Sequence, residues 1–81
     1  MSAVAHLAAN VARMRAQRRL TQGQLATLAD LHRTLIVQIE GGVANPRLET
    51  LRRLAAALST DVASLLVPPP RSRASSRRRA A

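Results

Sequence analysis

The sequence predicts an all-α fold of five short helices, and three observations support this. Apolar residues return at intervals of three and four positions through residues 1–67, as in helices with one buried side. No segment alternates apolar and polar residues in the way of a half-buried strand. The 81 residues include no aromatic side chain and no cysteine, so aliphatic residues alone must form one small core.

The first helix is expected at about residues 2–18. Val4, Leu7, Val11 and Met14 form one apolar stripe along it.

The second helix is expected to begin after Thr21, because Thr21 and Gln24 have the spacing of a capping box. Its buried side is expected to consist of Leu25, Ala26, Leu28 and Ala29. The next three residues, Asp30 to His32, break the helical pattern and predict a tight turn.

A third helix is expected over residues 33–40. Its buried side is expected to hold Leu35, Ile36 and Ile39. Gly41 and Gly42 then end it, since glycine is the usual residue just beyond a helix C-terminus.

Two further helices are expected after residue 44. Asn45 and Pro46 are expected to open the fourth helix, because proline is tolerated in a first turn. Its apolar face is expected to comprise Leu48, Leu51, Leu54, Ala55 and Leu58. Asp61 is expected to cap a final helical turn that starts at Val62 and ends at Leu66 or Val67.

The composition changes at Pro68, which we predict as the boundary between a domain of residues 1–67 and a tail of residues 68–81. The tail reads PPPRSRASSRRRAA and is predicted to be disordered, because it holds no residue suited to a core. Its five arginines have three interpretations: contact with DNA phosphates or a minor groove, solubility, or binding of another protein. Basic arms often contact nucleic acid, which favours the first.

The net charge of +9 and the pI near 12.0 are typical of a nucleic-acid-binding protein. All the basic residues are arginines, whose planar fork suits phosphates and guanine edges. An inert basic surface or an anionic membrane surface remains an alternative on composition alone. The absence of aromatic residues argues against platforms that stack single-stranded bases. No apolar run is long enough for a membrane span, and we expect a cytoplasmic protein.

The outer side of residues 33–40 carries the pattern that points to function. Four residues fall on one exposed face, namely Arg33, Thr34, Val37 and Gln38. Arginine, threonine and glutamine side chains hydrogen-bond base edges, and valine suits a thymine methyl group. We therefore favour base recognition over an ordinary solvated surface.

The segment LTQGQLATLADLHRTLIVQIEGGVANPRLETLRRLAAAL resembles the Cro and phage-repressor type of helix-turn-helix, also called the XRE family. The resemblance covers residues 7–67, with the helix-turn-helix proper at residues 21–40. It implies a lambda-repressor-like domain in a bacterial, sequence-specific regulator of transcription, held in the nucleoid when bound to double-stranded DNA. The third helix then corresponds to the recognition helix, which enters the major groove.

The resemblance also implies roles for individual residues. The base-reading positions are those of Arg33, Thr34, Val37 and Gln38. Positions that contact the DNA backbone match Gln22, His32, Asn45 and Arg47. Arg15 and Glu40 match a structural ion pair between the first helix and the recognition helix. A homodimer interface is expected from Val62, Leu65, Leu66 and Val67, which would place two recognition helices about 34 Å apart on a palindrome.

Several positions depart from the family pattern. Asp30 replaces a common glycine in the turn, and His32 replaces the usual serine or threonine cap. Val37 stands where serine is frequent, and Arg47 where a serine cap is common. Gly23 replaces a better helix former at a cost of up to ~1 kcal/mol.

Nothing in the sequence indicates an enzyme, a metal site or a cofactor. The four carboxylates are scattered, and no nucleophile lies in a pattern with a base. His6 is isolated and is expected to be exposed. No small-molecule ligand is expected. The main alternative is an antitoxin or another protein-binding module, and a toxin or polymerase is a possible partner. A third alternative is an architectural protein that binds DNA without sequence preference.

Overall fold

The computed structural model describes residues 2–70, and the prediction of five helices in an all-α fold is confirmed within that range. The helices are α1 (Ala3–Gln17), α2 (Gln22–Ala29), α3 (Arg33–Glu40), α4 (Leu48–Ala57) and α5 (Val62–Leu66). None of them is long and apolar enough to cross a membrane. The prediction of a disordered tail concerns residues 68–81, of which 71–81 lie outside the described range.

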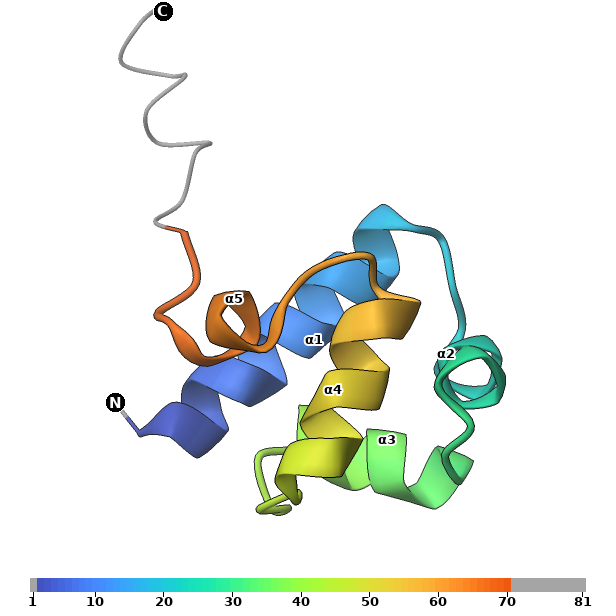
Figure 1. Cartoon of the computed structure of the whole chain (residues 1–81), viewed down its shortest axis with the longest axis horizontal. Coiled ribbons are helices and arrows are strands. Elements are labelled where there is room, and N and C mark those ends of the chain that lie inside the picture. Colours follow the sequence, from blue (N-terminus) through green and yellow to red (C-terminus); the bar gives the residue numbers. More distant parts are fainter. Residues whose placement is uncertain (1, 71–81) are drawn as a thin grey trace, which may run out of the picture.

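The helices surround one aliphatic core. α1 packs against α3 and α5, α2 against α3 and α4, and α4 against α5. Figure 1 shows α5 beside the half of α1 nearest the N-terminus, and α2 and α3 together at the opposite side of the molecule. The buried apolar residues come from α1 to α5 and the residue after α4: Leu7, Val11, Leu25, Ala26, Ala29, Ile36, Ile39, Leu51, Leu54, Ala55, Leu58 and Leu65.

Two helix starts follow the predicted capping chemistry. The Thr21 hydroxyl accepts a hydrogen bond from the Gln24 amide at 3.0 Å, and the Gln24 side chain accepts one from the Thr21 amide at 2.8 Å. Asp61 accepts from the Ser64 amide at 2.8 Å and so caps α5. In both cases a side chain satisfies an amide that has no partner within the helix.

Four of the helices are followed by a residue in the left-handed backbone region. These residues are Arg19, Asp30, Gly42 and Ser59. Each turn is closed by an amide that donates back over five residues; that of Leu31, for example, bonds the Ala26 carbonyl at 2.9 Å. The chain therefore turns sharply after each helix and returns to the core.

Two leucines expected in the core are exposed instead. Leu28 is 60% exposed and Leu48 is 66% exposed. Successive helical residues are rotated by about 100°, which places Leu28 roughly 105° from the centre of the face formed by Leu25, Ala26 and Ala29. Leu48 is the first residue of α4, ahead of the part of that helix that reaches the core. Leu35 is half-buried and packs against the core from its edge.

The fourth helix begins later than predicted. Asn45 and Pro46 do not open it, because Arg47 is extended (φ −70°, ψ 162°) and α4 starts at Leu48. Pro46 thus belongs to the connection that precedes the helix, where its fixed φ and missing N–H are also tolerated.

Two predictions about residues where α1 meets α5 are wrong. Leu65 is fully buried in the core of its own chain, so it has no surface to offer a second subunit. His6 is half-buried rather than exposed, because α5 packs against α1 and brings the Leu66 carbonyl within 3.3 Å of His6 Nδ1.

Candidate nucleic-acid interface

The turn between α2 and α3 sets the direction of α3. Asp30 adopts φ 57° and ψ 49°, a conformation that aspartate tolerates better than most residues. Its amide donates to the Thr27 carbonyl at 3.2 Å, and the next amide closes the turn. Asp30 therefore performs the conformational role for which a glycine is common in the family.

α3 has two faces of different character. Ile36 and Ile39 are completely buried and fix this helix on the core. The opposite face carries Arg33, Thr34, Val37 and Gln38, all exposed. Within residues 2–70, none of these four side chains takes part in a hydrogen bond or an ion pair. Their donors and acceptors are therefore available to a ligand.

Arg33 lies over the first turn of α2. A Cβ atom added at Gly23 would be 3.8 Å from Arg33 Cδ and 3.9 Å from Thr21 Oγ1. The aliphatic part of Arg33 thus runs beside α2, so the start of α2 and the start of α3 contribute to one surface.

An ion pair joins the far end of α3 to α1. Arg15 Nε lies 2.6 Å from Glu40 Oε2, and Arg15 Nη2 lies 3.0 Å from Glu40 Oε1. Arg15 also donates to the Leu20 carbonyl at 2.8 Å. The hydrogen bond with Glu40 raises the pKa of the Arg15 guanidinium. This bidentate pair is largely buried and ties three segments together.

The side chain of Gln22 joins the same network. Its Nε2 donates to Glu40 Oε1 at 3.2 Å, from the first residue of α2. Gln22 thus orients Glu40 within the domain. The amide oxygen of Gln22 forms no hydrogen bond within residues 2–70.

The other residues expected at the DNA backbone lie around α3. His32 and Arg47 occupy the positions just before α3 and α4, and neither makes a side-chain capping bond. Both side chains are exposed, as is Asn45 in the connection between these helices.

Sequence patterns did not identify Arg53 as a contributor to this region. Its Nη1 donates to the Asp30 carbonyl at 3.2 Å and lies 3.6 Å from Asp30 Oδ2. It also pairs with Glu49 at 3.4 Å, one turn earlier on α4. Arg53 therefore links α4 to the turn before α3. The separation of 23 positions from Asp30 leaves no local pattern by which to find it.

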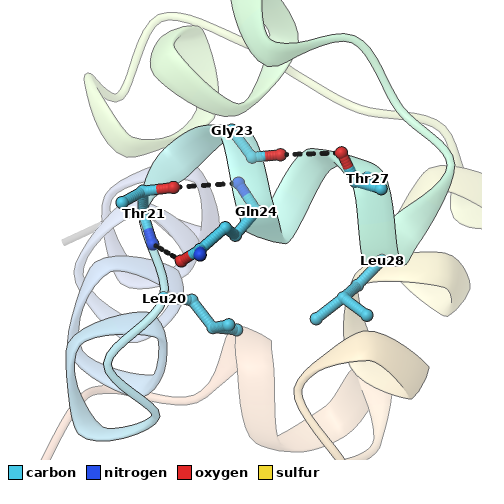
Figure 2. Close-up of a pocket in the computed structure, with 6 residues that line it drawn as sticks. All are labelled: Leu20, Thr21, Gly23, Gln24, Thr27 and Leu28. Carbon is cyan, nitrogen blue, oxygen red and sulfur yellow. Dashed lines mark hydrogen bonds between the residues drawn. The ribbon is translucent and has the colours of Figure 1, made fainter.

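A separate, open hollow lies on α2 and the connection that precedes it. Figure 2 shows Leu20 and Leu28 pointing into this hollow, beside the capping box of Thr21 and Gln24. Thr27 also lines it and bonds the Gly23 carbonyl at 3.1 Å. None of the exposed residues of α3 contributes to its lining.

The geometry defines a class of protein. α2 and α3 form a helix-turn-helix. α2 has a capped N-terminus, a tight turn follows it, and α3 has one buried apolar face and one exposed polar face.

The described residues include no cluster of three or more His, Cys, Asp or Glu side chains that would suit a metal ion.

Comparison with known proteins places the chain within a family. The protein-family model described as "Helix-turn-helix domain" matches residues 6–66 of this chain. Control protein C.SmaI from Serratia marcescens is 47% identical over 60 residues, which span 74% of this chain and 71% of that protein. The chain belongs to the helix-turn-helix domain family, as the resemblance predicted.

Solved structures agree with this assignment. The hypothetical transcription factor NHTF from Neisseria is 33% identical, with a TM-score of 0.79 over 82% of this chain and 74% of that one. The restriction-modification controller protein C.AhdI from Aeromonas hydrophila is 27% identical, with a TM-score of 0.73 over 76% of this chain and 94% of that one. Hydroxypropylphosphonic acid epoxidase from S. wedmorenis contains the same fold within 37% of its chain, at 24% identity and a TM-score of 0.75 over 85% of this one. The predicted function, a sequence-specific DNA-binding regulator of transcription, is confirmed.

Proposed function

We propose that the chain regulates transcription as a homodimer that reads a palindromic operator through α3. The observation that carries this proposal is the division of α3, with Ile36 and Ile39 buried and the opposite polar face exposed. Arg33, Thr34 and Gln38 supply hydrogen bonds to base edges, and Val37, which is 41% exposed, supplies an apolar contact.

The DNA backbone is contacted on both sides of α3. On one side are His32 and the start of α2. There the amide oxygen of Gln22 has no hydrogen-bond partner among the described residues, and the first amides of the helix attract a phosphate. On the other side, Asn45 and Arg47 extend from the connection between α3 and α4. Such contacts fix the register of α3 without choosing a sequence.

Base reading is tested by selection of a preferred site from random duplexes with the full chain, followed by single substitutions. Arg33→Ala and Gln38→Ala should each weaken binding of that site by ~1–3 kcal/mol and change binding of random DNA little. Arg52→Ala is the matched control, because Arg52 is an exposed arginine on α4 whose one ion pair among residues 2–70 is with Glu49 at 3.4 Å. Equal losses on both DNAs for Arg33→Ala would mean that Arg33 does not read bases.

The second subunit is proposed to dock on the outer side of α5. Val67 is 51% exposed, and Val62 and Leu66 are half-buried at the edge of the core. A dimer built there would read two half-sites roughly 10 bp apart. Enrichment of a palindrome with that spacing supports the dimer, whereas enrichment of a single half-site contradicts it.

The regulator is proposed to act in the bacterial cytoplasm, without catalytic activity, cofactor or small-molecule ligand. Two of the similar proteins are named as controllers, one of them of restriction and modification. We therefore propose the control of a small set of neighbouring genes, such as those of a restriction-modification system. Sites selected from genomic DNA should then lie in the promoter region of such genes, and sites scattered over the genome would argue against this role.

The arginines of the tail are proposed to add affinity through phosphates. Replacing all five with serine in the full chain should reduce the salt dependence of binding, by ~0.9 in the log–log slope for each phosphate that the tail no longer neutralises. The preferred sequence should not change. An unchanged slope would leave solubility or protein binding as the role of these residues.

A protein partner is the second candidate function, as for an antitoxin or a regulator that touches polymerase. The exposed Leu28 and the hollow it shares with Leu20 favour it, because a contiguous apolar surface often binds protein. Leu28→Ser should then abolish regulation in cells while operator binding by the purified chain persists. If Leu28→Ser leaves both regulation in cells and operator binding unchanged, this candidate function is wrong.

A further inference from the structure

Asn10 is the one buried polar side chain among residues 2–70, and it lies in the middle of α1 with no exposed surface. Its Nδ2 donates to the carbonyl oxygens of Leu65 at 2.9 Å and of Val67 at 2.7 Å. Its Oδ1 accepts a hydrogen bond from Arg13 Nη2 at 2.9 Å. All the polar atoms of the Asn10 amide are therefore engaged.

These bonds meet a specific need of the C-terminal end of the domain. The last carbonyls of a helix have no partner inside it, and further amides beyond the helix usually satisfy some of them. Here Pro68, Pro69 and Pro70 follow directly, and proline has no N–H to donate. The carbonyls of residues 65 and 67 are instead capped by Asn10, and that of residue 66 is capped by His6 Nδ1.

We infer that Asn10 is a positioning residue for the homodimer surface, a role that rests on the dimer proposed above. α5 has only five residues, with Leu65 fully buried and Val62 and Leu66 packed at the edge of the core. The hydrogen bonds from Asn10 add directional contacts to this apolar packing. Bonds from one amide group to carbonyls on either side of Leu66 fix both the rotation and the end of this short segment. They thereby hold Val62, Leu66 and Val67 in the arrangement that a second copy of the chain would contact.

The test compares dimerisation, half-site binding and thermal stability in the full chain. Asn10→Leu keeps a similar side-chain volume but leaves the carbonyls without donors. We expect the dimer dissociation constant, measured by sedimentation, to rise at least tenfold. Binding of one subunit to a single half-site should stay within about twofold, because the side-chain hydrogen bonds of Asn10 go to Leu65, Val67 and Arg13 and none of them reaches α3.

The control is Leu25→Val, which alters a fully buried residue of α2, a helix on the other side of the core from α5. It should lower the melting temperature without a tenfold effect on dimerisation. His6→Leu removes only the bond to Leu66 and should weaken dimerisation less than Asn10→Leu; it also serves if Asn10→Leu does not fold.

The outcomes separate the two proposals. If the wild-type chain forms a dimer that Asn10→Leu and His6→Leu weaken no more than Leu25→Val does, then Asn10 contributes only to stability and the inference is wrong. A wild-type chain that remains monomeric on its operator would overturn the dimer itself, and the positioning role with it.

Discussion

The α2–α3 pair and the α1–α5 pair share one apolar core but are joined in different ways. α2 and α3 are neighbours in sequence and are joined by a three-residue turn. α1 and α5 are far apart in sequence. The side chains of His6 and Asn10 on α1 bond backbone carbonyls that lie 55 to 60 positions later in the chain. The exposed polar side chains of α3 therefore stay available to a ligand, whereas Asn10 and His6 of α1 are used to fix the geometry of α5.

This difference has a physical cause. The residues around α2 and α3 satisfy their backbone locally, through the capping box and the left-handed turn at Asp30. The C-terminal end of α5 is followed by three prolines, which supply no amide donors, so its carbonyls depend on side chains of α1. Substitutions that remove apolar volume, charge or backbone freedom test how each pair of helices is held in the domain.

The largest effect is expected from Ile36→Ala. Ile36 is fully buried on the inner face of α3, so its loss leaves a cavity that should reduce the free energy of unfolding by ~2–5 kcal/mol. Chemical denaturation measures this directly. Val37→Ala, on the outer face of the same helix, is the control and should change stability little. Similar losses for both variants would contradict the two-faced description of α3.

A smaller loss is expected from Glu40→Ala. It removes the partner of the largely buried Arg15 and the acceptor for Gln22, which should reduce stability by about 2 kcal/mol. Glu49→Ala breaks only exposed pairs with Arg52 and Arg53 and should cost at most about 0.5 kcal/mol. Equal effects in urea unfolding would show that the Arg15–Glu40 pair does not anchor α3 to α1.

Gly23→Ala should stabilise the domain. Its new Cβ would make ordinary contacts with Arg33 and Thr21 at 3.8 and 3.9 Å, and alanine favours a helix over glycine by up to ~1 kcal/mol. Gly42→Ala should act in the opposite direction by a similar amount, because Gly42 has a φ of +74°. Melting temperatures of the two variants should therefore move to opposite sides of the wild-type value.

The smallest effect is expected on the stability of the domain at low pH, through the Asp61 cap of α5. The hydrogen bond from the Ser64 amide lowers the pKa of Asp61, so the carboxylate is more acidic in the folded chain than in the unfolded one. Its contribution to stability is present above the unfolded pKa of about 4 and is lost as the pH falls through the lower, folded pKa. Asp61→Asn retains an acceptor at every pH. Between pH 7 and pH 2 the melting temperature of the wild type should fall more than that of this variant, and parallel profiles would contradict the role of the charge.

Local patterns in the sequence were enough to predict much of the α2–α3 pair. The capping box, the tight turn that starts at Asp30, the end of α3 at the two glycines and the exposed residues of α3 all depend on neighbours within a few positions. The same patterns misplaced Leu28, which lies beside the buried face of α2, and Leu48, which lies at the start of α4 before that helix reaches the core. They also gave no indication that Arg19 and Ser59 take left-handed conformations.

Residue types and short spacings therefore suffice for the number and order of the helices, the polar face of α3 and the family, but not for the start of α4. Three further features emerge only when the chain is folded: the attachment of α5 to α1, the place of Leu65 in the core, and the link from Arg53 on α4 to the turn before α3. Each of them depends on contacts across 20 or more positions in the chain, for which no periodic pattern exists. Whether a side chain such as Asn10 is a solvated amide or a buried cap is set by which backbone carbonyls the fold brings to it.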